Sequence, residues 1–377
     1  MRIRCWLIAV VLAIGCLSDS SATLAHPAAS SLPVELDDRE FWTLTERLSE
    51  PNGYFRSDNF LSNERGYQVV IPDLVSRTTP GGVYLGVGPE QNFPYIVAVK
   101  AHMAFIIDIR RGNLHEQLLY KALFELSTDR ADFLSRLFSR PRPDGLSRES
   151  SVAQMFDAYN QVPASERQYK QNLAAVVDRL TKTHRFPLEE DDRRGIAYVY
   201  HEAFYSGGPN LNYSIGRGGF SRNSPTYEEL MLTDDGHGEN RGYLATEESF
   251  AFLKNLESRN LLIPVVGNFS GPKAIRAVGR YIGERGGTVS AFYLSNVEQF
   301  LRQNGTWDTF CASVATLPLD DASTFIYSSR DPYDANGGFS TFGFGLQTRI
   351  RPILSEVRGC SASNVASRVG LQPARPQ

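Results

Sequence analysis

The sequence predicts an α/β fold in which helices cover both faces of a doubly wound, mostly parallel sheet. Two segments, residues 81–111 and 261–294, carry this expectation because each contains a strand, a glycine-containing turn, a helix and a second strand. Strands that alternate with helices along a chain are typical of parallel sheets. A chain of 377 residues, of which 42% are hydrophobic and 21% charged, is long enough to bury a large core.

The N-terminus reads as a secretory signal peptide that is not part of the fold. Arg2 and Arg4 precede an apolar run over residues 5–17, and small residues lead to a cleavage point after Ala25. The apolar run is too short for a comfortable transmembrane helix. We therefore expect an exported protein, periplasmic or secreted. A lipid on Cys16, which would attach the chain to a membrane, and an uncleaved anchor are the alternatives.

The folded domain is expected over residues 37–365, after a flexible lead-in at 26–36 and before a disordered tail at 366–377. Asp37 or Asp38 is expected to cap its first helix. Three apolar residues at spacings of three and four form one face of that helix: Phe41, Leu44 and Leu48.

The segment 81–111 is the most informative part of the chain. Its expected elements are a strand at 82–86, a polar turn at 87–92, a helix at about 92–100 and a strand at 103–109. Gly86 ends the first strand, and Asp108 stands near the tip of the second, 22 positions later. Nucleotide-type cofactors are usually held this way, because glycines let the backbone approach the ligand and the carboxylate accepts hydrogen bonds from ribose hydroxyls. The structural alternative is a tight turn that needs glycine, with Asp108 paired to Arg110 or Arg111.

Helical periodicity at about residues 114–190 predicts an insertion of helices after the second strand. Residues 195–204, which are rich in apolar and aromatic side chains, are expected to form a strand. Residues 206–242 are rich in Gly, Asn, Ser and Arg and are expected to form a long loop. Two interpretations of this loop stay open: a lid from which Tyr213 and Arg217 reach a ligand, and a surface loop.

The alternation of strands and helices returns in the C-terminal half. The expected elements are a strand at 261–266, a turn at 267–272, a helix at 273–283 and strands at 288–294 and 324–328. The turn carries Asn268 and Ser270 at the carboxyl edge of the expected sheet, where open α/β folds bind ligands. Backbone N–H groups at the start of the next helix can face an anion there. The structural alternative is a turn that Ser270 caps.

The chain resembles a bacterial family of uncharacterised proteins with a class I S-adenosylmethionine-dependent methyltransferase-like fold. Four stretches within residues 40–330 carry the resemblance: YLGVGPEQNFPYI, FIIDIRRGNLHEQLLYKALFELS, PVVGNFSGPKAIRAVGRYI and SAFYLSNVEQFL. The resemblance implies a Rossmann-like fold with a helical insertion and S-adenosylmethionine as the cofactor. It assigns Gly86 and Gly88 to the glycine positions of the cofactor loop and Asp108 to the acidic position that binds the ribose.

The chain departs from the usual pattern of this fold at two places in the loop. Leu85 stands where an acidic residue ordinarily precedes the first glycine, and Pro89, Glu90 and Gln91 stand where a third glycine is absent. Glu90 can supply the missing carboxylate from the other side of the turn, with Gln91 beside it. A dinucleotide is a poorer fit, since the loop does not complete G-x-G-x-x-G.

Three residues are candidates for a catalytic role: Asn268, Glu298 and His237. Asn268 can orient a carbonyl or an amine. Glu298 can act as a base if burial raises its pKa, or it belongs to a capping box with Ser295. His237 lies among acidic residues and reads as a metal ligand, a general base or a solvated loop histidine. A dense polar turn upstream either reaches the same site or satisfies its own backbone: Asn59, Asn63 and Glu64.

Other chemistries have weaker support. A net charge of −3 provides no basic field for nucleic acid. No H-E-x-x-H pattern occurs, so we expect no metal site. Ser270 stands one position away from the G-x-S-x-G pattern, so a hydrolase that uses Ser270 or His237 is a third hypothesis. Cys311 and Cys360 are expected either to form a disulfide or to remain as two buried thiols.

Two functions from different classes come before the hydrolase. In the first, an enzyme binds S-adenosylmethionine and transfers its methyl group to an unknown acceptor, mostly by positioning the two reactants. In the second, a non-catalytic envelope protein has lost the cofactor and uses the cleft for a small-molecule ligand or an envelope partner. The leader and the missing carboxylate at Leu85 favour the second, because S-adenosylmethionine is not expected to be supplied outside the cytosol.

Overall fold

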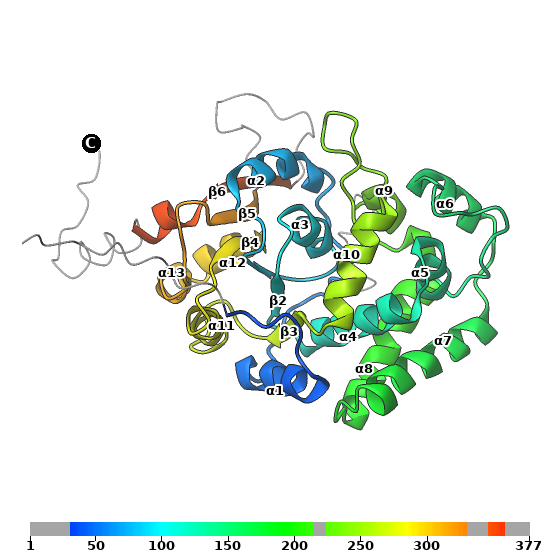
Figure 1. Cartoon of the computed structure of the whole chain (residues 1–377), viewed down its shortest axis with the longest axis horizontal. Helices are drawn as coiled ribbons and strands as arrows, with labels where there is room; N and C mark the ends of the chain where they lie inside the picture. Colours follow the sequence, from blue (N-terminus) through cyan, green and yellow to red (C-terminus); the bar gives the residue numbers. More distant parts are fainter. Residues whose placement is uncertain (1–30, 214–223, 330–345, 359–377) are drawn as a thin grey trace, which may run out of the picture.

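The computed structural model describes residues 31–213, 224–329 and 346–358. At its centre lies a six-stranded sheet with the order β3-β2-β1-β4-β5-β6 (Figure 1). Neighbouring strands run parallel except β6, which runs antiparallel to β5. The strands are β1 (Val83–Gly86), β2 (Met103–Asp108), β3 (Leu262–Val266), β4 (Val289–Ser295), β5 (Thr324–Ser329) and β6 (Gln347–Pro352). The expected α/β class with a mostly parallel sheet is confirmed.

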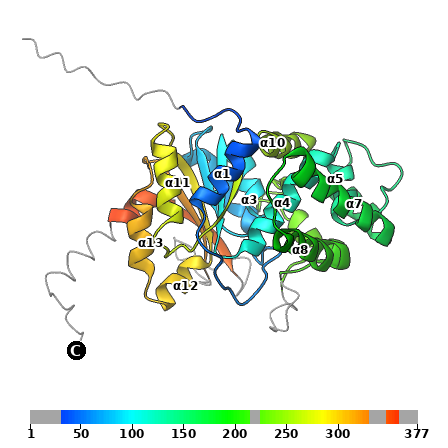
Figure 2. The same ribbon diagram turned by 90° about the horizontal axis from the view of Figure 1, so that it is seen from below.

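Helices cover both faces of the sheet (Figure 2). From β1 the strand order grows outward through β2 and β3 on one side and through β4 and β5 on the other. Right-handed crossovers therefore place the helices of the two halves on opposite faces. One face carries α3 (Asn92–Ala98), α4 (Arg111–Leu126) and α10 (Glu247–Ser258), and the other carries α11 (Ala274–Gly283), α12 (Val297–Gln303) and α13 (Trp307–Val314).

The inner strands are apolar because both of their faces are covered. Every residue of β1, β2 and β3 is buried, as near-continuous apolar runs in a doubly covered parallel sheet require. Asp108 is the one charged residue in these three strands, and it pairs in register with Val266, the last residue of β3. The ends of β2 and β3 are therefore level, and polar groups that follow them meet at one edge.

A block of helices stands beyond the first face: α5 (Arg130–Leu137), α6 (Val152–Asn160), α7 (Glu166–Asp178) and α8 (Glu190–Val199) (Figure 2). Aromatic rings join this block to the cover of the sheet. The ring centroids of Phe124 on α4 and Phe133 on α5 lie 4.7 Å apart, and Phe124 lies 5.3 Å from Phe250 on α10. The block is thus anchored through α4 and α10.

The expected strand at residues 195–204 is wrong. These residues end α8 and continue through a π-helical turn at Tyr200–Tyr205. The buried side chains lie three and four positions apart, as on one helical face: Ile196, Val199, Tyr200, Ala203 and Phe204. Apolar and aromatic composition favours a strand locally, but packing of α8 against α4 selects the helix.

The expected first helix is confirmed as α1 (Asp38–Leu48), with Asp37 as its cap. The Glu40 N–H donates to Asp37 Oδ1 at 2.7 Å, and the Asp37 N–H donates to Glu40 Oε2 at 3.0 Å. This reciprocal pair is a capping box. The predicted apolar face of α1 is buried, and the helix packs on β3 and α11.

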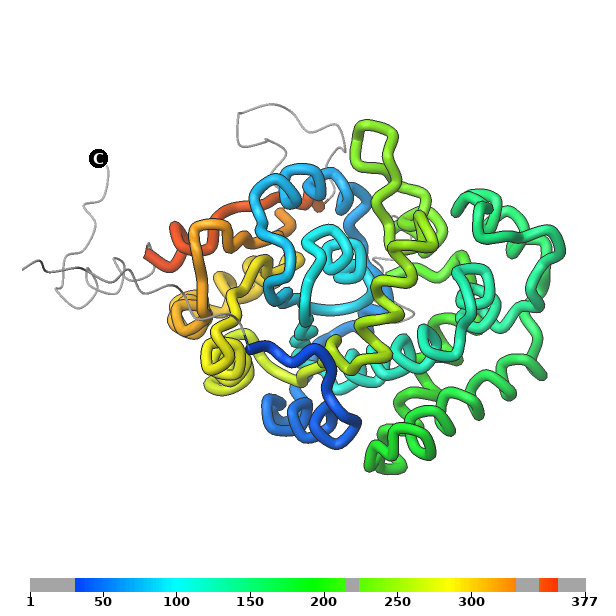
Figure 3. The backbone as a smooth tube through the Cα atoms, viewed as in Figure 1, coloured from blue at the N-terminus to red at the C-terminus, as the bar shows by residue number. Residues whose placement is uncertain are grey.

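The remaining elements are short. They are α2 (Ile71–Arg77), α9 (Tyr227–Met231), 3-10 turns at Tyr67–Val70 and Gly208–Asn210, and a π-helical turn at Arg179–Thr183. The last strand returns to the N-terminal part of the domain, where β6 packs beside the turn at Tyr67–Val70 (Figure 3).

In the described part of the chain, no helix has the length and apolar character needed to cross a membrane. The leader with Cys16, the lid residue Arg217, Cys360 and the tail lie outside the described residues.

Candidate functional site

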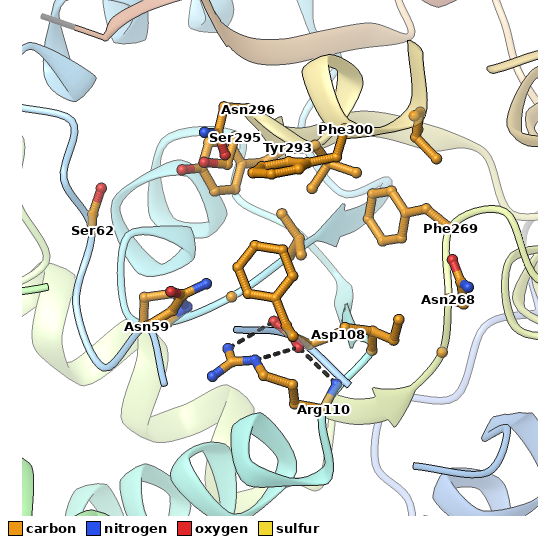
Figure 4. A pocket seen from close by; sticks show the side chains of 18 of the residues that line it. Asn59, Ser62, Asp108, Arg110, Asn268, Phe269, Tyr293, Ser295, Asn296 and Phe300 are labelled. Carbon is orange, nitrogen blue, oxygen red and sulfur yellow. Dashed lines mark hydrogen bonds and ion pairs between the residues drawn. The ribbon is translucent and has the colours of Figure 1, made fainter. Parts of the chain in front are cut away.

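A cavity of about 260 Å³ opens at the carboxyl ends of β1, β2, β3 and β4 (Figure 4). The strand order reverses between β1 and β4, and open α/β sheets bind ligands at this point. Asp108 and Arg110 lie on one side of the cavity, and Tyr293 and Phe300 lie on the opposite side (Figure 4). Asn268, from the turn after β3, lies at one end. The cavity is thus formed by segments that are distant in sequence.

Asp108 lines the cavity and is paired with Arg110, as the structural alternative expected. Its Oδ1 accepts the Arg110 backbone N–H at 2.9 Å and Nε at 3.1 Å, while Oδ2 accepts Nη2 at 3.1 Å. Both side chains are nearly buried, at 7% and 12% exposure. The negative charge of Asp108 is therefore compensated within the chain, although Oδ2, which accepts one donor, keeps room for a second.

The glycine loop is held by Asn92, which the sequence analysis did not identify. Its Nδ2 donates to the carbonyls of Val87 at 3.0 Å, Gly88 at 3.3 Å and Pro89 at 2.7 Å. A Cβ at Gly86 would lie 1.8 Å from Asn92 Oδ1, so internal packing is sufficient to require glycine there. Gly88 lines the cavity with a φ of +81°. The sequence signal that could have identified Asn92 is its position, since it is an amide at the first residue of the helix that follows the glycine loop.

Gln91 also lines the cavity and connects it to a buried carboxylate, Glu64. Glu64 Oε1 accepts the hydroxyls of Tyr293 at 2.9 Å and Ser295 at 2.5 Å. Its Oε2 accepts Gln91 Nε2 and the Thr348 hydroxyl, each at 3.0 Å. Glu64 therefore does more than satisfy a local turn, because it joins the N-cap residue of α3 to β4 and β6 behind the cavity wall.

Glu90 lies behind the loop and does not line the cavity. It is only 1% exposed, and neither carboxyl oxygen has a hydrogen-bond partner among the described residues. Burial raises its pKa to about 8, against a smaller opposing effect of the backbone N–H groups of Glu90 and Ser62. In this position Glu90 does not offer a carboxylate to a ligand in the cavity.

The turn after β3 brings Asn268 and Ser270 to the cavity, as its position at the sheet edge predicted. Asn268 Oδ1 accepts both the backbone N–H and the hydroxyl of Ser270 at 3.0 Å. The anion that the sequence predicted at the start of α11 is a side chain of the protein itself, the carboxylate of Glu50. The Glu50 carboxylate accepts the N–H groups of Asn268 at 3.0 Å, Lys273 at 2.8 Å and Ala274 at 2.9 Å.

Glu298 and His237 do not line the cavity. Glu298 forms ion pairs with Arg302 at 2.7 Å and Arg351 at 2.6 Å. The capping box expected between Ser295 and Glu298 is absent, because Ser295 adopts a left-handed φ of 49° and its hydroxyl donates to Glu64. The backbone N–H of His237 donates to Asp235 Oδ1 at 2.9 Å.

The cavity contains aromatic surfaces that the sequence analysis did not assign to it. Phe55, Phe269 and Phe300 line it, and the rings of Phe55 and Phe300 meet edge to face at 5.3 Å. Tyr213, the predicted lid residue, also lines it. No group of three or more His, Cys, Asp or Glu residues converges as a metal site within the described ranges. The arrangement can stack a flat ring and offer neutral hydrogen-bonding groups around it.

Comparison with known proteins finds one family. Its model matches residues 59–206 and 147–336 and is described as "Domain of unknown function (DUF7790)". The two matches overlap, and together they extend over more than half of the chain and over most of the cavity wall. No protein with a curated description matches the chain.

Proposed function

Since this chain belongs to the DUF7790 family, whose description assigns no activity, we propose a function from the site alone. We propose that the cavity binds the nucleoside part of a small molecule, and that the chain is an exported binding protein with a methyltransferase-like fold. One observation carries the proposal. The cavity lies where the strand order reverses, between the Gly88 loop and the Asp108 strand tip.

The chemistry of the cavity wall supports a nucleoside. The Asp108 carboxylate still has acceptor capacity for one ribose hydroxyl at Oδ2, since three donors occupy its two oxygens. The rings of Phe269 and Phe300 offer surfaces on which a planar base can stack, and the Asn268 amide can read a base edge. The methyltransferase type of the fold rests on the four resembling stretches together with the Rossmann-like strand order.

The described residues fit the adenosine part of S-adenosylmethionine better than its amino-acid end. Leu85 is fully buried within β1, and Glu90 stands behind the wall. Among the described lining residues, the only charged side chains are the mutually paired Asp108 and Arg110. The amino-acid end would therefore enter without an opposite charge, which is costly in a partly buried site.

Methyl transfer from S-adenosylmethionine to an unknown acceptor is the second candidate function. The observation that favours it is Asp108, which occupies the ribose position that the resemblance assigns. A hydrolase has less support, because the Ser270 hydroxyl donates to Asn268 and none of the described lining residues is a histidine.

Calorimetric titration of the chain from His26 onward with adenosine and with S-adenosylmethionine tests the proposal. We expect one-to-one adenosine binding that weakens about tenfold or more in Asp108→Ala, the equivalent of about 1.4 kcal/mol. Asp73→Ala, which removes an exposed carboxylate of α2, serves as the matched control and should bind as the wild type does. Lack of binding by both compounds up to millimolar concentration would overturn the nucleoside site.

We propose export from the leader. The disulfide bond of Cys311 supports this proposal, since structural disulfides persist in oxidising compartments. The ligand would then be a molecule that is present outside the cytosol.

A further inference from the structure

We infer that the cavity selects uncharged nucleosides and discriminates against nucleosides that carry a phosphate or an amino-acid group. This inference rests on the proposed nucleoside site and adds the chemical class of its ligand. It is based on three carboxylates around the cavity, those of Glu50, Glu64 and Asp108. Each of them already accepts hydrogen bonds from donors of the chain itself.

Glu64 cannot receive a cationic group from the ligand. Its four hydrogen bonds, at 2.5 to 3.0 Å, come from neutral donors on three different segments. Two donors on each oxygen fill the usual acceptor capacity of a carboxylate. Glu64 is also fully buried, at 0% exposure, so an ammonium group would have to displace Tyr293, Ser295 or Gln91 to reach it.

Glu50 stands where a phosphate would bind in many folds of this type. It accepts three backbone N–H groups at the turn before α11 and at the first turn of that helix, at 2.8 to 3.0 Å. These are the donors that would otherwise hold an anion. A Cβ at Gly271 would lie 2.3 Å from Glu50 Oε2, so the carboxylate is fitted closely to the turn. A ligand phosphate would find these donors occupied and a negative charge beside them.

Asp108 and Arg110 compensate each other through three hydrogen bonds. Arg110 also points Nη1 at the Ser57 carbonyl at 3.4 Å. An incoming carboxylate or phosphate would therefore have to compete with Asp108 for the guanidinium. An incoming ammonium or sulfonium group would have to compete with Arg110 for the carboxylate.

The rest of the described wall is neutral and hydrogen-bonding or aromatic. It carries five asparagines at different points: Asn59, Asn63, Asn268, Asn296 and Asn304. Amides can donate to and accept from hydroxyls and base edges without a net charge. A charged group that leaves water for such a wall loses hydration without gaining a partner. An uncharged nucleoside meets no such penalty.

A probe series measures this selectivity by calorimetry on the chain from His26 onward. The uncharged probes are adenosine and 5′-deoxy-5′-methylthioadenosine, and the charged probes are adenosine 5′-monophosphate, S-adenosylhomocysteine and S-adenosylmethionine. We expect the uncharged probes to bind at least tenfold more tightly than each charged one. Equal or tighter binding of any charged probe would overturn the inference and leave the nucleoside site standing. Binding by none of the five would overturn both.

Two charge variants provide an independent test. Arg110→Gln leaves the Asp108 carboxylate uncompensated, so affinity for S-adenosylmethionine should rise relative to adenosine by about fivefold or more. Asp108→Asn frees Arg110, so affinity for adenosine 5′-monophosphate should rise relative to adenosine in the same way. Arg142→Gln, which breaks the ion pair of Arg142 with Asp129, the N-cap residue of α5, is the matched control and should leave both ratios unchanged. Constant ratios in both test variants would overturn the inference, and circular dichroism establishes that each variant is folded.

Discussion

At the scale of single residues, the carboxylates near the site differ in their partners and not in their chemical type. Glu64 has four donors and Asp108 has an arginine, whereas Glu90 has no partner among the described residues. Sequence position predicted where Asp108 would lie. It could not predict the state of Glu64, because Tyr293 and Thr348 come from segments more than 200 positions away. The role of a carboxylate depends on donors that only folding brings together.

Glu90 predicts a pH dependence of stability. Burial raises its pKa from 4.5 to about 8, so the folded state keeps a proton that the unfolded state releases above about pH 4.5. The stabilisation is therefore complete below about pH 4.5 and is lost as the pH rises towards 8, at about 1.4 kcal/mol for each pKa unit. We expect urea denaturation at pH 5, 6.5 and 8 to show a shallower decline for Glu90→Gln than for the wild type.

Two other buried acids determine how strongly the free energy of unfolding of Glu90→Gln still declines between pH 5 and pH 8. Glu257 has a pKa raised to about 8 by burial, and burial likewise raises that of Glu116, so the slope in Glu90→Gln should shrink without vanishing. Glu239→Gln changes an exposed side chain and should keep the wild-type slope. An unchanged slope in Glu90→Gln would contradict the assigned burial of Glu90.

Gly86 gives a second prediction at this scale. In Gly86→Ala the new Cβ would meet Asn92 Oδ1 at 1.8 Å and a ring carbon of Tyr84 at 2.8 Å, so overpacking should destabilise the fold by about 1–3 kcal/mol. Gly112→Ala in α4 meets no atom within 4 Å and should be neutral or slightly stabilising. Thermal unfolding compares the two. If Asn92→Ala does not reduce the loss caused by Gly86→Ala, then Asn92 is not the reason for the glycine.

At the scale of elements, the sequence predicted the strands whose apolar residues form a continuous run. The strands β1 to β4 were predicted because they are almost wholly apolar. The edge strand β6 was missed because its exposed and half-exposed residues, including Arg349 and Arg351, show no apolar run. Residues 195–204 were assigned wrongly because aromatic and β-branched residues suit a strand, while their burial against α4 occurs at helical spacing.

The capping box of α1 yields a prediction about an element. Asp37→Ala removes the acceptor that holds the Glu40 N–H at 2.7 Å, and loss of such a cap typically costs about 1 kcal/mol. Because α1 packs on β3 and α11, the loss should appear in the cooperative unfolding transition measured with urea. Glu35→Ala, two positions before the cap and exposed, is the matched control. Equal midpoints for the two variants would show that the cap contributes nothing.

At the scale of the whole molecule, topology sets the position of the cavity, and contacts between distant segments set its charge. The alternation of strands and helices was sufficient to predict a carboxyl edge at which Asp108 and Asn268 meet, and both line the cavity. It was not sufficient to predict that Glu50, which follows α1, would fill the start of α11. A sequence motif that covers one loop therefore predicts where a ligand binds better than it predicts the chemical class of that ligand.

The disulfide bond of Cys311 provides a test of which cysteine it pairs with and of whether the protein is exported. Cys311 is disulfide-bonded, and Cys360, which lies outside the described residues, is the one other cysteine beyond the leader. We propose that the two pair in the exported protein. The unfolded chain from His26 onward should then show no reactive thiol before reduction and both cysteines after it.

Reduction or Cys360→Ser should lower the free energy of unfolding by about 2–4 kcal/mol, because the open chain gains conformational entropy. Cys360→Ser should also expose one reactive thiol, that of Cys311, in the unfolded chain. A non-reducing gel separates this pairing from a disulfide between two chains, which would run as a dimer. Protein recovered from its native cells with both thiols free would contradict the pairing and remove the support that the disulfide gives to export. The search for a ligand would then turn to uncharged nucleosides of the cytosol.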